Sequence, residues 1–372
     1  MGNFFLNLFI VLTLVAPGDG RIRVAAFALC MLTNINKLRY TFERFSIFLV
    51  FVIVVLFGIS VVYIRGINND VNLMSVFLLG IFFLEPTKIK ITTGLHIASM
   101  SIIFMTLLYL LLVYYFPGIE LVLVPLLDNF FHGEPRERQI IYFLRIFSVF
   151  HLASPILVFS LAIVWYQYLM NRKIKNIIYT FLIFICLIFS GTRANFFSAI
   201  LIVLIVYLHY SFFVKKRMVR TIFWLTATSF LAIIGTYILL IRMDSSSIAK
   251  LGHFHSYMEL FNNNISYFLL GQGAGAYFFT FGFNEVTSGT ELSYLELIRM
   301  FGIFATLLIL FIYILPFLKN RNYRLPGVFS IGIAYLAYLF IAGTNPLLVG
   351  RTGFIVLWLA YTLFVQEGHK CA

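Results

Sequence analysis

Charged residues are scarce in this sequence. Asp, Glu, Lys and Arg make up 11% of its 372 residues, whereas hydrophobic residues make up 62%. So few polar side chains cannot cover the surface of a water-soluble protein of this length, but a surface that faces lipid does not need them. The composition therefore excludes a soluble globular protein and predicts a polytopic membrane protein.

Cysteines and nucleotide-binding motifs are also nearly absent. Of the three cysteines, Cys30 and Cys186 fall in apolar stretches and Cys371 in the tail, so neither a disulfide framework nor a CxxC metal pair can be drawn. The sequence has no P-loop and no Asp-x-Asp pair. These absences argue against a step driven by nucleotide hydrolysis and against a divalent metal that holds a nucleotide sugar.

Apolar stretches long enough to cross a membrane follow one another along the chain. A spanning helix needs roughly 17 to 25 apolar residues. The clearer candidates are Phe45–Ile64, Leu95–Phe116, Val149–Leu169, Ile177–Ser190, Ala194–Phe213, Thr221–Ile241, Leu292–Leu318, Val328–Gly343 and Phe354–Val365; shorter ones are Phe4–Ala16, Val24–Thr33 and Asn72–Leu84. The pattern predicts an all-α, polytopic transmembrane helical bundle of about twelve spans, with residues 1–372 forming a single integral membrane domain. The first stretch lacks a charged flank and an A-x-A-like cleavage site, so it is interpreted as a retained span rather than a signal peptide.

The basic residues predict the orientation. With the N-terminus inside, the inner loops hold sixteen of the 27 basic residues but only three of the 14 acidic ones, Glu43, Glu85 and Glu367. The inner bases are Lys37, Arg39, Arg44, Lys88, Lys90, Arg172, Lys173, Lys175, Lys215, Lys216, Arg217, Arg220, Lys319, Arg321, Arg324 and Lys370. The positive-inside rule predicts such a bias for cytoplasmic loops. Both termini are therefore expected in the cytoplasm, and the high pI is interpreted as a topology feature rather than a nucleic-acid footprint.

Two longer loops then lie outside, residues 117–148 and residues 242–291. The second is the one long polar segment of the chain, with two histidines, four carboxylates and a glycine-rich turn. Loops of this length are usually functional or disordered, so we expect the chemistry there. In the first loop, apolar residues at 140, 141, 143, 144 and 147 predict that Arg136–Phe147 is an amphipathic helix on the membrane.

Arginines gather toward the outer ends of the spans. A lone charge at the bilayer centre costs at least about 2.5 to 3.5 kcal/mol, so charges near membrane depth need a partner or a ligand. A guanidinium keeps its charge and donates two parallel hydrogen bonds to phosphate. A lipid-borne phosphate or pyrophosphate is therefore the ligand predicted for Arg193, Arg242, Arg299 and Arg351.

Four motifs carry a resemblance to a known family. They are Ser190–Ala194, Lys250–His253, Gly271–Gly275 and Thr290–Arg299, in this order and at these places in the topology. With them the chain resembles the bacterial O-antigen polymerases of the Wzy type, over residues 180–320. The resemblance implies a GT-C-like bundle in the bacterial inner membrane. It also implies that undecaprenyl-pyrophosphate-linked glycans are joined as donor and acceptor at the periplasmic face, with membrane lipid and a chain-length regulator protein as further partners and no nucleic acid.

That reaction assigns roles to residues. Cleaving a glycosyl pyrophosphate bond requires fixed cations at the leaving group and a base at the acceptor hydroxyl, but neither a metal nor a cofactor, so we expect a metal-independent, inverting glycosyltransferase. The residues expected at the pyrophosphate are Arg193, Arg242, Lys250, Arg299 and Arg351. The catalytic candidates are His253 and Glu291, and the supporting ones are Gly271, Gly273 and Glu296.

The arginines also have structural interpretations. Arg193 can be an interfacial arginine that extends to head groups, and Arg242 and Arg351 can be topology anchors. Arg299 can form an ion pair with Glu296, which lies three residues earlier on the same helix face.

The loop residues have alternatives too. His253 can be an exposed loop histidine, and Glu291 can be a helix N-terminal charge favoured by the dipole. His253, His255 and Glu259 can be metal ligands, although two histidines are fewer than such a site usually has. The run Gly271–Gly275 is no dinucleotide fingerprint, because no strand-helix-strand unit surrounds it, and it is interpreted as a tight turn that lets backbone approach closely.

Two other functions stay open. An O-antigen ligase uses the same donor but passes the polymer to the lipid A core. A flippase or transporter for the lipid-linked unit is the non-enzyme alternative, and repeat symmetry, interrupted helices or polar groups at the midplane would favour it. The sequence shows little of these features. Tyr257, Tyr267 and Tyr277 are candidates for stacking on sugars.

Overall fold

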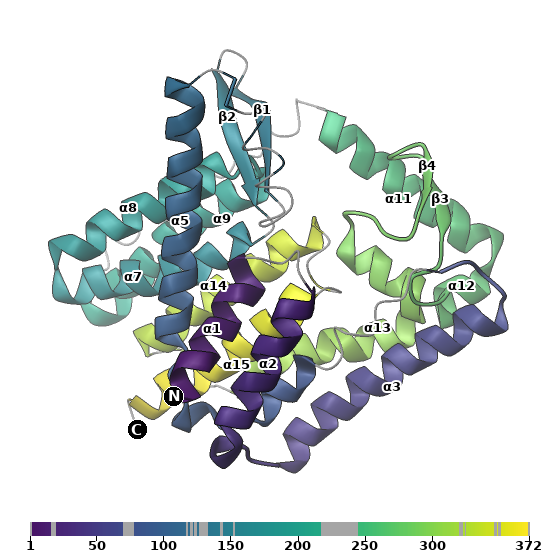
Figure 1. The fold of residues 1–372 in the computed structure, drawn as a ribbon, viewed down its shortest axis with the longest axis horizontal. Coiled ribbons are helices and arrows are strands. Elements are labelled where there is room, and N and C mark those ends of the chain that lie inside the picture. Colours follow the sequence, from purple (N-terminus) through teal and green to yellow (C-terminus); the bar gives the residue numbers. More distant parts are fainter. Residues whose placement is uncertain are drawn as a thin grey trace.

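Helices make up most of the computed structural model (Figure 1). The structure describes residues 2–15, 20–69, 78–116, 118–119, 122, 125, 133–141, 144–151, 153–216, 245–319, 323, 325–345, 348 and 351–370. The longer helices are α1 (Gly2–Val15), α2 (Gly20–Thr33), α3 (Phe42–Ile64), α5 (Thr92–Tyr115), α7 (Leu157–Asn171), α8 (Ile174–Phe189), α9 (Arg193–His209), α11 (Ser245–Asn263), α13 (Ser293–Lys319), α14 (Pro326–Gly343) and α15 (Arg351–Lys370).

The expected helical membrane architecture is confirmed in its coarse form. Within the described residues, six helical stretches are long and apolar enough to cross a membrane: α3, α5, α13, α14, Ser154–Asn171 around α7, and Arg193–Val214, which begins with α9. Local sequence explains where several of them begin. The Thr41 hydroxyl accepts from the backbone N–H of Arg44 at the start of α3, and Pro326 opens α14, where a missing N–H costs nothing.

Most predicted spans coincide with helices, and the exceptions are informative. The prediction of a span from Val149 to Leu169 begins too early, since Val149 lies in a strand and the helical stretch starts at Ser154. The end of the predicted span Asn72–Leu84 is a short 3-10 helix, Leu78–Phe83. The predicted span Thr221–Ile241 lies outside the described residues.

Two small hairpins depart from a purely helical fold. β1 (Gly133–Ile141) pairs antiparallel with β2 (Leu144–His151), and β3 (Phe278–Thr280) with β4 (Glu285–Thr287). The prediction of an amphipathic helix over Arg136–Phe147 is therefore wrong. The stretch from residue 144 is rich in aromatic and β-branched residues, which favour strands, and pairing with the adjacent segment closes only a short loop.

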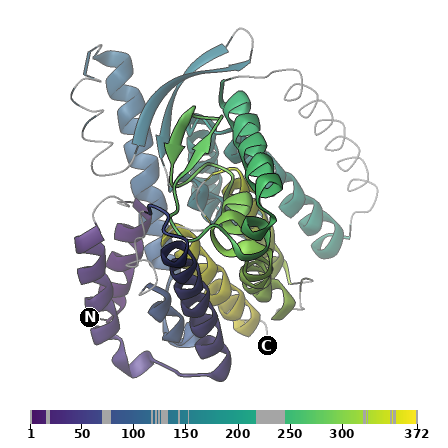
Figure 2. The same ribbon diagram turned by 90° about the vertical axis from the view of Figure 1, so that its right-hand side faces the viewer.

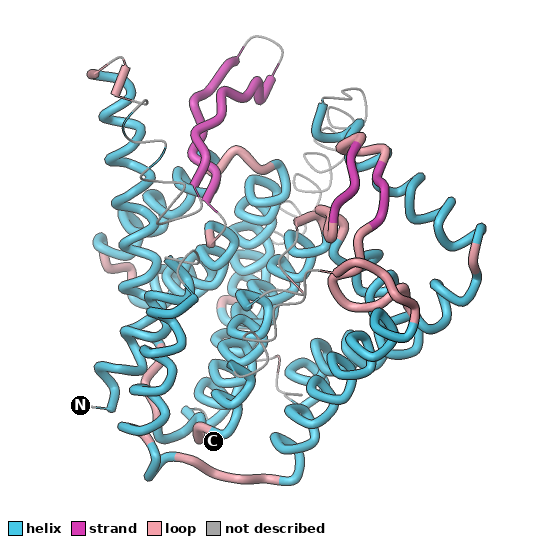
Figure 3. Tube along the Cα trace, turned by 45° about the vertical axis from the view of Figure 1, so that its right-hand side comes forward, coloured by secondary structure: helices cyan, strands magenta, loops and turns pink. Residues whose placement is uncertain are grey.

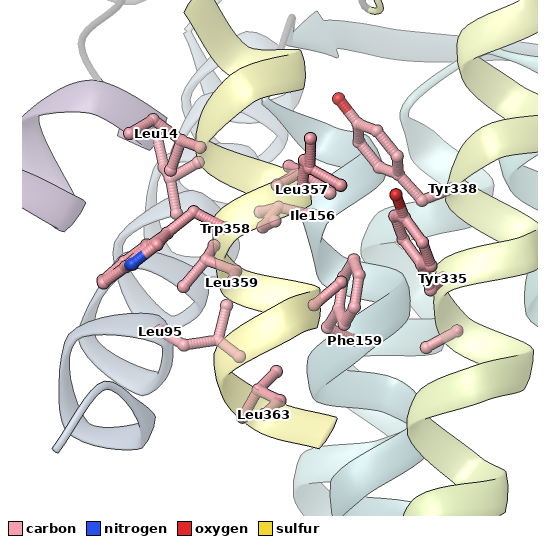
Figure 4. Packing of buried hydrophobic residues seen from close by; sticks show 14 of the residues in the cluster. Leu14, Leu95, Ile156, Phe159, Tyr335, Tyr338, Leu357, Trp358, Leu359 and Leu363 are labelled. Atoms are coloured by element: carbon pink, nitrogen blue, oxygen red, sulfur yellow. The ribbon is translucent and has the colours of Figure 1, made fainter. Parts of the chain in front are cut away.

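The helix α15 lies in the middle of the bundle and is buried on all sides. Its residues from Ile355 to Ala360 are each at most 1% exposed. Figure 4 shows Leu14 and Leu95 on one side of α15 and Phe159 and Tyr338 on the other. A helix that is apolar all round is a core helix. Here α1, α5, α7 and α14 surround it and form the scaffold of the molecule.

The two ends of the bundle differ in what they carry. Figures 2 and 3 show both hairpins at one end and the two chain termini at the other. At the end with the termini, Glu43 pairs with Lys319. Glu85 there pairs with Arg39 at 2.7 Å and with Lys88 at 2.9 Å. The positive-inside pattern assigns all five residues to the inner face, and the structure brings them together; which compartment this end faces stays a prediction.

Candidate functional site

The polar segment predicted as a loop is a folded unit from residue 245 onward. It consists of α11, the short α12 (Ile265–Leu270), the glycine-rich turn and the β3–β4 hairpin. Tyr257, Phe261 and Phe278 form a small apolar core there, joined by residues before and within α13, namely Leu292, Leu295 and Ile298. The loop prediction is wrong here because packing on α13 stabilises a helix whose polar composition does not itself indicate one. The helix α11 consequently has a defined place beside α13 (Figure 1).

Arg299 is the centre of a buried polar network. Its side chain is 0% exposed. Nε donates to Glu296 Oε2 at 3.0 Å, and Nη2 donates to Glu296 Oε1 at 2.5 Å. Nη1 donates to Gln272 Oε1 at 2.8 Å and to the carbonyl of Ala276 at 2.6 Å. Nη2 also donates to the carbonyl of Ser288 at 2.8 Å.

A guanidinium has five N–H donors, and all of them are used inside the protein. Arg299 therefore has no donor left for a pyrophosphate, so the structure does not support the expectation that it binds the ligand. The ion pair with Glu296 is the interpretation that the structure shows. The pair joins α13 to the glycine-rich turn and makes both residues structural.

Tyr257 extends this network to the residues before α13. Its hydroxyl lies 2.5 Å from Glu296 Oε2, to which it donates, and 2.6 Å from the Thr290 hydroxyl. Burial raises the pKa of Tyr257. Its side chain is 0% exposed, and this excludes stacking of its ring on a sugar. The partners lie 33 and 39 residues away along the chain, so no local sequence pattern indicates them.

The glycine-rich turn fits between α3 and α13. Gly271, Gly273 and Gly275 have φ values of 82°, 117° and 67°, a region that side chains rarely adopt. A Cβ on Gly271 would lie 2.7 Å from the carbonyl oxygen of Met300, and one on Gly273 would lie 2.6 Å from Val62 Cβ. The interpretation as a tight turn with close backbone approach is confirmed.

Replacing Gly302 by alanine is expected to destabilise the protein by about 3 kcal/mol, from backbone strain and overpacking together. Gly302 interrupts α13 with a φ of 80°, and a Cβ there would lie 2.3 Å from the carbonyl oxygen of Leu269. Gly66→Ala is the matched control, because Gly66 has a φ of 63° but nothing within 4 Å of a Cβ. Thermal unfolding in detergent compares the two, and equal losses would show that the contact with Leu269 is unimportant.

Arg193 begins α9 directly after a tight turn. Gly191 in that turn has a φ of 69°, and buried Asn195 donates to the Ser190 hydroxyl at 2.8 Å. These contacts fix the first turn of α9. Arg193 Nη1 lies 3.3 Å from the Ser247 hydroxyl, to which it donates, so Arg193 lies against the beginning of α11.

Lys250 lies three residues after Ser247 on α11, hence on the same helix face. Its Nζ is 3.5 Å from Glu291 Oε2, and the two side chains are 30% and 34% exposed. Arg193, Lys250 and Glu291 thus border one patch of surface, although they come from α9, α11 and the segment before α13. We call these three residues the α11 patch. The sequence analysis named all three as candidate site residues.

His253 lies behind this patch and is 0% exposed, so the alternative of an exposed loop histidine is wrong. Its Nδ1 lies 2.5 Å from the Thr280 hydroxyl of β3, and the Phe283 ring packs against it at 4.3 Å. Nε2 is buried without a hydrogen-bond partner among the described residues. Burial lowers the pKa of His253, an effect that the carboxylate of Glu291 opposes and the charge of Lys250 reinforces.

Acid is expected to loosen the packing of α11 on the hairpin. The pKa of His253 lies below its ordinary value of 6.5 in the folded protein, so the unfolded chain takes up the proton at a higher pH than the folded one. The stability from burying the neutral ring is therefore complete above pH 6.5 and is lost as the pH falls below it. Hydrogen exchange of the α11 amides, corrected for intrinsic rates, measures this between about pH 7.5 and about pH 5.5. In His253→Gln the difference should vanish, and a difference that persists would assign it to another group.

The other predicted residues do not join the patch in the described part of the chain. Arg242 lies outside the described residues. Arg351 begins α15, but its side chain is not among those that the structure describes. In the described residues, no three His, Cys, Asp or Glu side chains come together as metal ligands, so nothing supports a metal on His253, His255 and Glu259.

Comparisons with known proteins add no relative. No protein-family model matches the chain, and no curated protein sequence matches it. The assignment of a function therefore depends on the geometry of the α11 patch and on the motifs that surround it.

Proposed function

We propose that this protein is a membrane-embedded glycosyltransferase that polymerises oligosaccharide repeat units carried on undecaprenyl pyrophosphate, at the outer face of the bacterial inner membrane. The α11 patch is the observation that supports it most. It combines two cations, which suit a lipid-borne pyrophosphate, with one carboxylate that reaches the surface. Three of the motifs that resemble O-antigen polymerases meet at this patch, and they supply the reaction class.

The reaction requires one bond to form and one to break. The acceptor hydroxyl of one lipid-linked unit attacks the anomeric carbon of the donor glycan, and the bond from that carbon to the pyrophosphate oxygen breaks. The electron pair leaves with undecaprenyl pyrophosphate, whose growing charge Arg193 and Lys250 stabilise. The hydroxyl proton passes to the carboxylate of Glu291. Attack opposite to the leaving group inverts the anomeric configuration.

The exposure of the two candidate bases separates their roles. Glu291 is about one third exposed and can touch an acceptor hydroxyl. His253 is fully buried, with its ring held by Thr280 and covered by Phe283. We therefore assign the base to Glu291 and a positioning role to His253, which holds the hairpin on α11 beside the patch. A pyrophosphate at Lys250 competes with Glu291 for the ammonium, so binding of the donor frees the carboxylate to accept a proton.

Deleting the gene and examining the surface polysaccharide tests this proposal against its alternatives. A polymerase predicts lipopolysaccharide capped with a single repeat unit. Polymer left on the carrier with no sugar attached to the lipid A core would indicate a ligase. Single carrier-linked units trapped on the cytoplasmic side would indicate a flippase. Conversion of purified lipid-linked units into polymer by the isolated protein is the direct confirmation.

A further inference from the structure

Arg65 is a cation that the proposed reaction does not use, and it directly follows α3, a candidate membrane span. This helix has 23 residues from Phe42 to Ile64, so at 1.5 Å per residue it is about 35 Å long. The hydrocarbon core of a bilayer is about 30 Å thick. Glu43 and Lys319 mark one end of α3, so α3 as a membrane span brings Arg65, at its other end, to the head-group level of the opposite leaflet.

The contacts of Arg65 leave part of its guanidinium unused. The group lies over the ring of Tyr267 in α12, 4.5 Å from the centroid, and Nη2 donates to the Ser266 hydroxyl at 3.2 Å. Nη1 is buried and has no hydrogen-bond partner in the part of the chain that the structure describes. No carboxylate among the described residues pairs with it. A buried charged donor without a partner is costly, so the described part of the chain leaves this cation unneutralised.

Several apolar side chains close to Arg65 in the sequence or in α12 are exposed. Tyr63 and Ile64 precede it and are strongly exposed, and Ile265 and Leu269 of α12 are exposed on the neighbouring turn. Apolar side chains around an arginine and a tyrosine are typical of the membrane interface. The surface is continuous with the lipid-facing side of α3. At this depth the anions available are the phosphates of lipids.

We propose that Arg65 and Tyr267 form a binding site for a phosphate group carried on a lipid, distinct from the α11 patch. The Tyr267 ring holds the guanidinium plane by a cation–π contact, and the partly exposed side chain of Arg65 supplies a charge-assisted hydrogen bond to a phosphate oxygen. The exposed residues of α3 and α12 contact the lipid chains. A bilayer phospholipid and the prenyl phosphate carrier share this chemistry. The site depends on no step of the proposed reaction.

Native mass spectrometry of the purified protein in detergent tests the site. The protein is titrated with phosphatidylglycerol, with undecaprenyl phosphate and with a phosphate-free diglucosyl diacylglycerol. We expect the phosphate-bearing lipids to be retained in preference to the sugar lipid, and the better retained of the two identifies the source of the phosphate. Arg65→Gln should weaken this retention about tenfold, the worth of one hydrogen bond to a charged group, and Arg65→Lys should weaken it less.

Arg172→Gln is the matched control, because Arg172 also lies over a tyrosine, Tyr168, at 5.4 Å. Its lipid retention should equal that of the wild type. Thermal unfolding shows whether Arg65→Gln folds. If it does not, Arg65→Lys and Tyr267→Leu, which removes the stacking ring, are used in its place. The proposal is overturned if the phosphate-free lipid is retained equally well, or if the Arg65 and Arg172 variants behave alike.

Discussion

Replacing Arg299 by glutamine is expected to destabilise the protein by about 3 to 5 kcal/mol, the usual cost of removing one partner from a buried ion pair. The variant leaves the carboxylate of Glu296 buried without its counter-charge. It also removes the donors to the carbonyls of Ala276 and Ser288. Native proteins are stable by only about 5 to 15 kcal/mol, so a loss of this size should lower the unfolding temperature and the yield of folded protein. Thermal unfolding and size-exclusion chromatography in detergent measure this.

A double variant separates the structural role of Arg299 from a catalytic one. Arg299→Met combined with Glu296→Leu removes both charges, and replacing a buried pair by apolar side chains is often neutral or stabilising. The double variant should therefore be more stable than Arg299→Gln alone. If Arg299→Gln is instead as stable as the wild type but forms no polymer, Arg299 has a role in binding the pyrophosphate.

The membrane-spanning part of the fold could be predicted from the sequence because its determinants are local. The run Leu292–Leu318 is mostly apolar, with Glu296 and Arg299 as its two charged residues, and α13 coincides with it within one residue at each end. Helices in lipid satisfy all their backbone hydrogen bonds internally, so length and hydropathy suffice. The internal interruption at Gly302 was not predicted, since it depends on contact with α12.

Outside the spans, the errors come from tertiary contacts. The segment Arg136–Phe147 is predicted as a helix because its apolar positions follow a helical period, and pairing between β1 and β2 overrides that local pattern. The α11 segment is predicted as a loop because it belongs to the one long polar segment between apolar spans. Its helix is stabilised by packing of Tyr257 and Phe261 against Phe278 and residues of α13.

The candidate site could be predicted by residue type but not by arrangement. Outer-face charges identify Arg193, Lys250 and Glu291 one at a time, and the contact between Arg193 and Ser247 bridges 54 residues. The burial of His253 and Arg299 is equally invisible in the sequence. It changes the assigned roles of both, because a side chain without exposed surface cannot touch a substrate.

Removing either cation of the α11 patch is expected to abolish most polymerisation while leaving the fold intact. A unit charge at about 4 Å is worth roughly 4 kcal/mol at an effective dielectric near 20, and each 1.36 kcal/mol is about tenfold in rate. Arg193→Gln and Lys250→Gln should therefore each lower the rate at least about 100-fold. Both side chains are partly exposed, so stability should change little. Conversion of lipid-linked units by purified protein measures the rate, with Lys88→Gln, an ion-paired lysine at the other end of the bundle, as control.

Exchanging the two charges of the patch distinguishes chemistry from simple pairing. In the double variant Lys250→Glu with Glu291→Lys, the ion pair is kept but its ends are interchanged. If the pair only holds α11 beside α13, activity should survive the exchange. If Lys250 binds the leaving group and Glu291 accepts the proton, the double variant should be as stable as the wild type and as inactive as Lys250→Gln. The wild type and the double variant keep the same two side-chain types in contact. A difference in activity between these two proteins therefore reports where each charge must lie during the reaction.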